Sequence, residues 1–390
     1  MERIYMDNCL TSKPADEVIE AMLPYLRDKF QFPGNFVSSG SEISRDLEIF
    51  RSTIADSIGA KPAEIHFTTG GTSANNIAIK GYLSANADKG THIITSVIDY
   101  PDLLTNAAFF EQSGFEVTYL GADRDGFIDL EELENSIRPD TVMFLTTYVN
   151  HTVGTIQPLQ KIRQILDRAG HQIILHVDAC EAYGRIPINV DNLGIDLMSI
   201  SAHKIHGPQG VGALYQRNGI QLGAVKHGVV RLDVHETGGI STASIAGFAR
   251  AVELIFTDFN KYADRIRELS DYLLEQIEEK IPHTLLNGPR GYERAPHNIN
   301  ISFSFIEGEA IMVMLDLTGI SVATGSACAS QGLKANYVLM AMGRTHEESH
   351  GSIKFTLSRY NTKEEIDFTV SSLQKIVDEL RSRSPLYNKE

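Results

Sequence analysis

The chain has 390 residues, of which 42% are hydrophobic and 22% charged, and this composition predicts a soluble globular protein with two domains or one large domain and an appendage. The net charge of −15 argues against a nucleic-acid-binding surface, and no apolar run approaches the ~20 residues that span a membrane. Because there are only three cysteines and no signal-peptide pattern at the N-terminus, we expect a cytoplasmic protein without a disulfide framework.

Short apolar runs alternate with amphipathic stretches through the first 220 residues. The runs predict strands at residues 64–68, 92–96, 115–120, 141–147, 172–178, 196–201 and 212–216. Helical patterns lie between them, for example at residues 73–85 and 158–170. Near-continuous hydrophobic strands separated by helices are typical of a parallel sheet that is covered on both faces. Ligands of such sheets bind beyond the carboxyl ends of the strands, so the residues that follow each strand are the candidate site.

The rest of the chain predicts a smaller α/β unit. A long helical region covers residues 244–281, strands are expected at residues 298–304, 319–325 and 351–357, and a last helix at residues 362–382. We therefore expect an α/β fold with a large domain around a mostly parallel sheet, at residues 16–258. The smaller α/β domain would combine residues 1–15 with residues 259–390.

A glycine turn follows the first predicted strand, at residues 64–68. In "FTTGGTSANNIAIKG", Gly70 and Gly71 precede Thr72 and Ser73 at the start of a helix. Glycines let the backbone approach a ligand, and the free N–H groups at a helix start favour an anion such as phosphate. An N-capped helix after a tight turn explains the same residues equally well.

Two charged residues stand at the ends of later strands. Asp178 ends the apolar run "QIILHVD", where a carboxylate requires a partner, and Lys204 follows "DLMSIS" in "SAHKIHGPQG". Taken singly, Asp178 could cap a helix and Lys204 could be a solvated loop charge. Together with the glycine turn they match the needs of pyridoxal phosphate. The helix start would hold its phosphate, Asp178 its ring nitrogen, and Lys204 its aldehyde as a Schiff base.

The sequence resembles the cysteine desulfurases, pyridoxal-phosphate enzymes of the class V aminotransferase superfamily with the type I fold. The resemblance runs from "IYMDNCLTSKP" to "SPLYNKE", and its most specific segments are "SAHKIHGPQG" and "ATGSACAS". It implies that Lys204 forms the Schiff base, that Asp178 pairs with the ring nitrogen, and that Cys328 takes up the substrate sulfur as a persulfide. It also implies phosphate contacts from Gly71, Thr72, Ser201 and His203, and a substrate contact from Asn8 in the opening segment. Cys9 and Cys180 match no family cysteine and read as small buried thiols.

Several site positions depart from the family residue. Tyr100 replaces the histidine that stacks on the ring, so stacking is kept and a proton-transfer group is lost. His151 replaces an asparagine near the ring. Glu181 replaces the glutamine that faces the ring hydroxyl, where a carboxylate must be protonated or paired, and His151 is a candidate partner for it.

The substrate and subunit contacts also depart from the family. Lys354 replaces the arginine that holds the substrate carboxylate, which keeps the charge without the bidentate fork, and Arg359 is a second candidate for this role. Ile240 replaces the arginine of a segment that reaches the partner subunit's phosphate in the family, and Thr242 lies one place before the expected threonine, which aligns with Ala243.

Three functions remain open on the sequence. The first is a desulfurase that converts L-cysteine to L-alanine and passes sulfur through Cys328, with a homodimer and a sulfur-acceptor or scaffold protein, such as one for iron–sulfur clusters, as partners. The second is a related enzyme for another amino acid or for β-elimination, of the C–S lyase or desulfhydrase type. The third is a cofactor-binding or scaffold-docking protein with little catalysis. No metal ligands are predicted, although the sequence leaves open whether a metal or cluster binds at Cys328.

Overall fold

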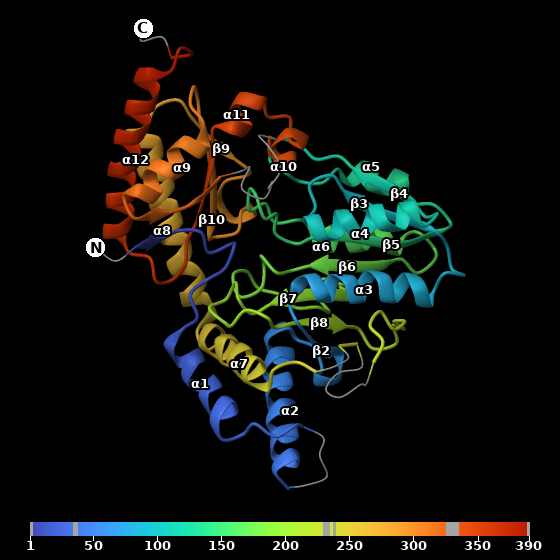
Figure 1. Cartoon of the computed structure of the whole chain (residues 1–390). Helices are drawn as coiled ribbons and strands as arrows, with labels where there is room; N and C mark the ends of the chain where they lie inside the picture. The colour runs from blue at the N-terminus through green and yellow to red at the C-terminus, as the bar shows by residue number, and fades with distance from the viewer. Residues whose placement is uncertain (1–2, 34–37, 229–234, 237–238, 325–334, 388–390) are drawn as a thin grey trace.

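The structure is a computed structural model that describes residues 3–33, 38–228, 235–236, 239–324 and 335–387 (Figure 1). Within these ranges, no helix is at once long and apolar enough to cross a membrane.

A seven-stranded sheet forms the centre of the larger part of the molecule. Its strands follow the order β2-β8-β7-β6-β5-β3-β4, and β8 alone runs in the direction opposite to that of the other six. The mostly parallel sheet predicted from the apolar runs is therefore confirmed. The strand bounds are β2 Ile65–Thr68, β3 His92–Ser96, β4 Glu116–Leu120, β5 Thr141–Thr147, β6 Ile174–Asp178, β7 Leu197–Ser201 and β8 Gly212–Gln216.

Successive residues of a strand point to opposite faces of the sheet, and in the central strands the residues on both faces are buried. Helices therefore cover both faces. Met143 of β5 belongs to one core with Ile77 and Leu103 of the helices α3 and α4, whereas Phe144 belongs to a larger core with Phe248 of α7. Helices α1 and α2 contact α7 and extend below the sheet in Figure 1. The bounds are α1 Asp16–Arg27, α2 Ser38–Ile58, α3 Gly71–Ala85, α4 Pro101–Gln112, α5 Leu130–Ser136, α6 Leu159–Asp167 and α7 Thr242–Phe256.

A second, antiparallel sheet has the strand order β12-β13-β10-β9. It lies with α8, α9 and α12 in the upper left of Figure 1, beside both chain termini. The N-terminal strand β1 pairs in parallel with β11, so the first residues join this later part of the chain. The bounds are β1 Ile4–Tyr5, α8 Phe259–Lys280, β9 Thr284–Asn287, β10 Asn298–Phe303, α9 Gly308–Leu317, β11 Ile320–Ser321, β12 Ala323–Thr324, α10 Tyr337–Ala341, α11 His346–His350, β13 Ser352–Thr356 and α12 Lys363–Arg383.

Two predicted elements are divided in the structure. The helical region 244–281 is two helices, because the chain turns at Thr257 and Asp258 between α7 and α8. The strand expected at residues 319–325 is divided into β11 and β12, which belong to different sheets. The domain boundary at residues 258 and 259 falls between α7 and α8 and stays a prediction.

Candidate functional site

The candidate site lies at the carboxyl ends of three neighbouring strands. Thr147 ends β5, Asp178 ends β6 and Ser201 ends β7, and the register places Thr147 opposite Asp178. Because these strands are parallel, the loops that follow them emerge at one edge of the sheet. The side chains that the sequence singled out after each strand are brought together there.

Asp178 is a buried carboxylate held by two neutral donors. One oxygen accepts a hydrogen bond from Asn75 Nδ2 at 2.8 Å, and the other accepts from the backbone N–H of Cys180 at 2.9 Å. Burial raises the pKa of Asp178, with these two hydrogen bonds opposing the shift. Asn75 is itself held from behind, because its Oδ1 contacts His176 Nε2 and Ser199 Oγ. The carboxylate is thus fixed in orientation and suited to a cationic partner, such as a protonated ring nitrogen.

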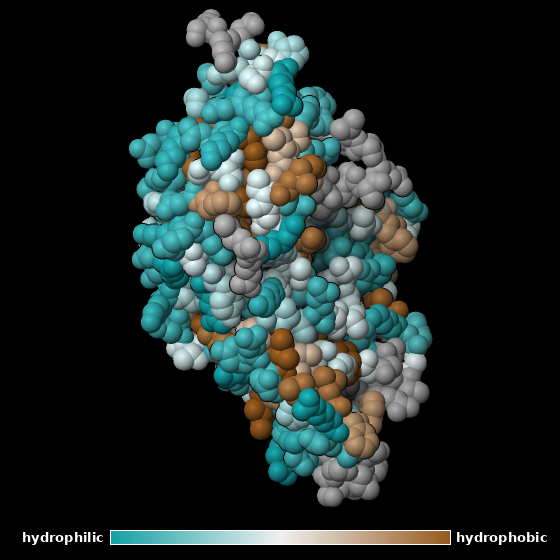
Figure 2. All heavy atoms as spheres, turned by 60° about the vertical axis from the view of Figure 1, so that its left-hand side comes forward, coloured by the Kyte–Doolittle hydropathy of each residue, from teal (hydrophilic) through white to brown (hydrophobic). Residues whose placement is uncertain are grey.

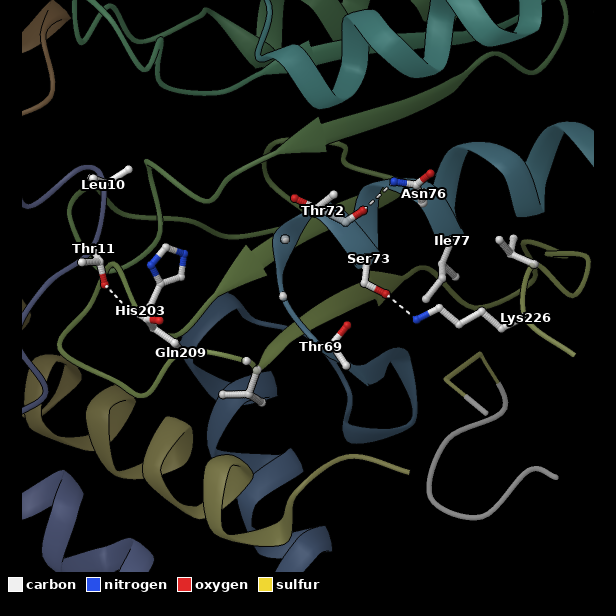
Figure 3. Close-up of a pocket in the computed structure, with 15 residues that line it drawn as sticks. Leu10, Thr11, Thr69, Thr72, Ser73, Asn76, Ile77, His203, Gln209 and Lys226 are labelled. Carbon is white, nitrogen blue, oxygen red and sulfur yellow. Dashed lines mark hydrogen bonds between the residues drawn. The ribbon is translucent and has the colours of Figure 1, made fainter. Parts of the chain in front are cut away.

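The glycine turn lines a cavity of about 800 Å³ at the start of α3 (Figure 3). Residues 69–73 and His203 form part of its wall, with Lys226 at one side. Gly71 packs closely on the loop after β6, since a Cβ there would lie 2.4 Å from Cys180 Sγ. The free N–H groups of the helix start and the nearby lysine make this wall suitable for a phosphate.

A buried carboxylate also contacts this cavity wall. Glu236 pairs with Lys226 and accepts a hydrogen bond from Ser73 Oγ at 2.9 Å, while Lys226 donates to Ser73 Oγ at 3.1 Å. Ser73 is thus held between the two charges, and Figure 3 shows its hydrogen bond with Lys226. Because Lys226 neutralises the negative charge of Glu236, this carboxylate does not prevent an anion from binding at the wall.

Lys204 is buried and forms an ion pair with Glu181, Nζ to Oε1. The other oxygen of Glu181 accepts from Arg185 Nη1 at 2.5 Å. Burial alone would raise the pKa of Glu181, but Lys204 and Arg185 outweigh it and hold the pKa well below its usual range. Arg185 also donates to the backbone oxygens of Asn8 and Lys204, at 2.8 and 3.1 Å. This arginine therefore fixes the backbone that carries the lysine.

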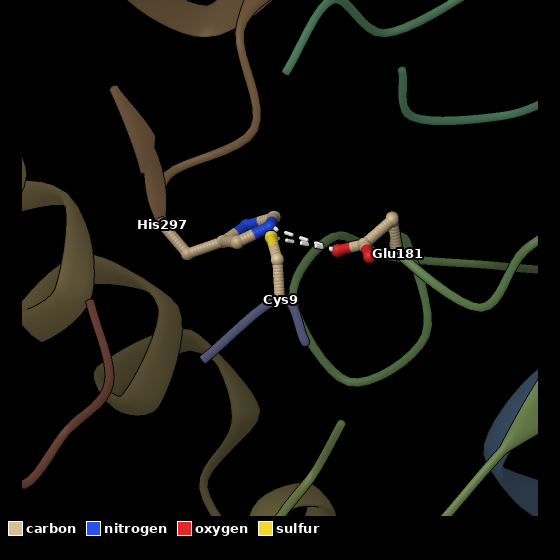
Figure 4. Close-up of side chains that lie close together, drawn as sticks. All are labelled: Cys9, Glu181 and His297. Carbon is tan, nitrogen blue, oxygen red and sulfur yellow. Dashed lines mark hydrogen bonds and ion pairs between the residues drawn. The ribbon is translucent and has the colours of Figure 1, made fainter. Parts of the chain in front are cut away.

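Cys9 and His297 complete the buried cluster around Glu181 (Figure 4). Cys9 Sγ donates to Glu181 Oε2 at 3.0 Å, and Arg185 Nη1 lies 2.8 Å from His297 Nε2. Since arginine can only donate, His297 Nε2 is the acceptor and the imidazole is neutral, in agreement with a pKa lowered by burial to about 3. Side chains of this kind can hold a metal ion, but the guanidinium of Arg185 already supplies the positive charge at this place.

Tyr100 and His151 form an aromatic wall beside Lys204. The Tyr100 ring lies 5.4 Å from Lys204 Nζ and meets the His151 ring edge-on at 5.0 Å. His151 Nε2 lies 3.2 Å from the hydroxyl of Tyr337, which donates to the backbone oxygen of Asp99. Burial lowers the pKa of His151 to about 3, so this imidazole is neutral.

The structure corrects one expectation and places the substrate candidates. His151 is not the partner of Glu181, because the carboxylate is already paired with Lys204 and Arg185. Lys354 Nζ donates to the backbone oxygen of His151 at 3.2 Å, which places it at the aromatic wall. Arg359 instead contacts Tyr360 and lies over Tyr262, so it is turned toward other tyrosines.

The remaining predicted residues have different positions. Asn8 is buried and donates to the backbone oxygen of Thr356 at 2.8 Å, a contact that holds the N-terminal segment on β13. Ile240 packs against the main core, and Thr242 is the first residue of α7.

Cys9 and Cys180 are both free and buried. Cys328 lies outside the described residues.

Asn75, Arg185, His297 and Tyr337 were missed in the sequence. Asn75 could have been found, because one turn into α3 is a place from which a side chain reaches a strand end. Arg185 and His297 have no local signal, since their partners are brought in by three separate segments of the chain. A lone arginine in a loop is usually a solvated charge.

Pyridoxal phosphate fits this donor set. The cavity wall at α3 offers an anion site, Asp178 a carboxylate without a cationic partner among the described side chains, and Lys204 a primary amine. Tyr100 adds an aromatic ring that faces the lysine. These are the four contacts that the cofactor's phosphate, ring nitrogen, aldehyde and ring face require.

Comparison with known proteins gives a consistent result. The model of the aminotransferase class-V family matches residues 4–368. The chain is 44% identical to the cysteine desulfurase IscS of Dictyoglomus turgidum, over 98% of this chain and 96% of that protein. It is 41% identical to the cysteine desulfurase IscS of Methanosarcina thermophila, over 99% and 95% of the two chains. A solved NifS-like protein superposes with a TM-score of 0.90 and 30% identity, over 97% of this chain and 100% of its own.

Proposed function

Because the chain belongs to the aminotransferase class-V family and to the cysteine desulfurases within it, we propose that it transfers the sulfur of L-cysteine to Cys328 and releases L-alanine. The enzymes of this family depend on pyridoxal phosphate. The single observation that carries the proposal is the position of Lys204, buried beside Tyr100 and one strand away from Asp178.

Each cofactor contact is assigned to a residue of the chain. Lys204 forms the covalent link to the aldehyde, Asp178 pairs with the ring nitrogen and Tyr100 covers one face of the ring. Gly71, Thr72, Ser201 and His203 hold the phosphate, while Glu181 and His151 line the ring edge. When bound, pyridoxal phosphate supplies an electron sink that stabilises the negative charge left at the substrate Cα.

The chain's own groups move the proton and the sulfur. Lys204 is the acid and base at the substrate Cα, because its amine is placed at the aldehyde carbon. The thiolate of Cys328 attacks the sulfur of the substrate, so an S–S bond forms as the Cβ–S bond breaks. Cysteine and a thiol thereby become alanine and a persulfide, with no further oxidant needed.

Asp178 has a testable electrostatic role. We expect Asp178→Asn to lower the rate of alanine formation by about 10²- to 10³-fold, because an amide cannot stabilise the positive charge on the ring nitrogen. The measurement is kcat of the cofactor-loaded variant, with the bound cofactor quantified by its absorbance. A variant with unchanged kcat would contradict this role.

Lys354 is proposed to bind the substrate carboxylate. We expect Lys354→Met to raise the KM for L-cysteine about tenfold or more, since a charged hydrogen bond of about 1.5–3 kcal/mol is lost. Lys354→Arg keeps the charge and is the matched control, with a KM near or below that of the original protein. If both variants keep the original KM, the carboxylate is bound elsewhere.

The products distinguish the reaction from β-elimination. The purified protein, incubated with L-cysteine and a thiol reductant, should release alanine and sulfide in equal amounts. Pyruvate and ammonia in place of alanine would show elimination instead and would overturn the desulfurase proposal.

A homodimer and a cytoplasmic location are part of the proposal. Figure 2 shows a largely hydrophilic face with hydrophobic side chains gathered in its lower part. Exposed apolar residues of the described chain include Leu26 of α1, Phe30 after it and Ile49 of α2, and burying them in a second subunit would be favourable. The sulfur acceptor would be a separate protein, such as a scaffold for iron–sulfur clusters.

A further inference from the structure

Glu181 joins the lysine of the site to a second buried cation. Its Oε1 accepts from Lys204, and its Oε2 accepts from Arg185 and, at 3.0 Å, from Cys9 Sγ (Figure 4). The side chains of Glu181 and Arg185 are each 3% exposed, and that of Lys204 is 8% exposed. Because all three side chains are buried, removal of one charge strongly changes the electrostatic energy of the other two.

Most other titratable groups around the ion pair of Lys204 and Glu181 are neutral. Burial, followed by the charge of Glu181, raises the pKa of Cys9 to about 12. Against the opposing charge of Lys204, burial and the charge of Glu181 raise the pKa of Tyr100 to about 12. Burial lowers the pKa of His203 to about 4, and those of His151 and His297 to about 3. The thiol of Cys180 has a pKa well above its usual value. None of these six groups changes its charge between roughly pH 5 and pH 11.

Other charged groups lie near the Lys204–Glu181 pair. Asp7 interacts with both members of the pair and with Lys354, Asp178 interacts with Lys204, and Arg185 interacts with Glu181. Burial is the main cause that raises the pKa of both aspartates. These groups and the cofactor are the same in a Glu181 variant, so a difference in loading rate between that variant and the original protein at one pH reports on the Lys204–Glu181 pair.

Glu181 is the largest of the causes that raise the pKa of Lys204. Burial, the largest cause of all, lowers this pKa, but Glu181 together with Tyr100, Cys180 and Cys9 outweighs it, and the pKa is raised above its usual value. If Glu181 were neutral, burial and the nearby Arg185 would remain and would favour the uncharged amine.

We propose that Glu181 controls the proton on Lys204 during covalent attachment of pyridoxal phosphate, holding the lysine as an ammonium until the aldehyde arrives. The inference rests on the proposed function, because it assumes that Lys204 is the attachment point. The ammonium must first lose its proton to a base in solution, a step that the charge of Glu181 opposes. The neutral amine then attacks the aldehyde carbon, a C=N bond forms, and the aldehyde oxygen leaves as water. Glu181 stays ionised throughout, because Arg185 continues to hold its other oxygen.

The test is the rate of covalent loading of the cofactor-free, full-length protein. Pyridoxal phosphate is added over a series of neutral to alkaline pH values, samples are quenched with borohydride, and the Lys204 peptide is quantified by mass spectrometry. We expect Glu181→Gln to load at least about tenfold faster at neutral pH, since each unit of pKa changes the neutral amine fraction tenfold. The rise of the rate with pH should also move to lower pH.

Control variants separate proton control from general damage to the fold. Asp196→Asn removes another buried carboxylate, one paired with Arg163, and should load like the original protein. If Glu181→Gln does not fold, the double variant Glu181→Gln/Arg185→Met removes one charge of each sign and should also load faster. Circular dichroism checks the folded state of each variant.

The outcomes bear on two separate claims. Equal or slower loading of the folded Glu181 variants, with an unchanged pH profile, would overturn the inference while leaving Lys204 as the attachment point. If no protein loads at Lys204, the proposed function itself fails. Faster loading confined to the Glu181 variants would support the inference.

Discussion

Lys204→Ala is expected to abolish covalent attachment of pyridoxal phosphate and to lower alanine formation from L-cysteine by at least about 10³-fold. The lysine has two proposed tasks, the link to the aldehyde and proton transfer at the substrate Cα, and alanine can perform neither. The ion pair of Glu181 with Lys204 would also be lost, although Arg185 would still hold the carboxylate.

Loading is measured by borohydride reduction and mass spectrometry, and turnover by alanine release. Lys375→Ala, which removes an exposed lysine on α12, is the matched control and should keep both loading and turnover. A Lys204→Ala protein that forms alanine at more than about one hundredth of the original rate would contradict the assignment of Lys204.

The second large effect is expected at Cys328. In Cys328→Ala no persulfide can form, so alanine formation should fall by at least about 10³-fold while the cofactor remains attached to Lys204. The absorbance of the bound cofactor and its change on addition of L-cysteine should be retained. This pairing of lost turnover with intact cofactor binding separates a nucleophile from a structural residue.

Cys328→Ser provides a second variant of similar size and should lose alanine formation to the same extent, because its oxygen cannot form a persulfide. An enzyme that eliminates sulfide from L-cysteine directly would not depend on Cys328. Continued sulfide release by either variant at the original rate would therefore contradict sulfur transfer through this cysteine.

The positions of the site strands were predictable because their signal is local. Asp178 ends one mostly apolar run and Lys204 follows another, and those runs form the central strands β6 and β7. The reversed direction of β8 could not be read from its residues, since an apolar run has no preferred direction. The turn at Thr257 and Asp258 was missed because the helical pattern continues on both sides of it.

The charges of the site were less predictable than its position. Glu181 was expected to need a proton or a partner, and the structure supplies two cations, of which one is Lys204 itself. Arg185 and His297 meet only in the folded chain, where 112 positions of sequence separate them. Long-range pairs of this kind leave no periodic pattern. The roles assigned to the site residues, Lys204 and Asp178 included, stay predictions.

The most direct measurement of the central claim is the mass of the Cys328 peptide after a single turnover. The cofactor-loaded protein is mixed with one equivalent of L-cysteine without reductant, digested under conditions that preserve persulfides, and compared with the untreated protein. Transfer of sulfur to Cys328 predicts a peptide heavier by one sulfur atom and one equivalent of alanine in solution. An unmodified Cys328 peptide alongside consumed cysteine would contradict it.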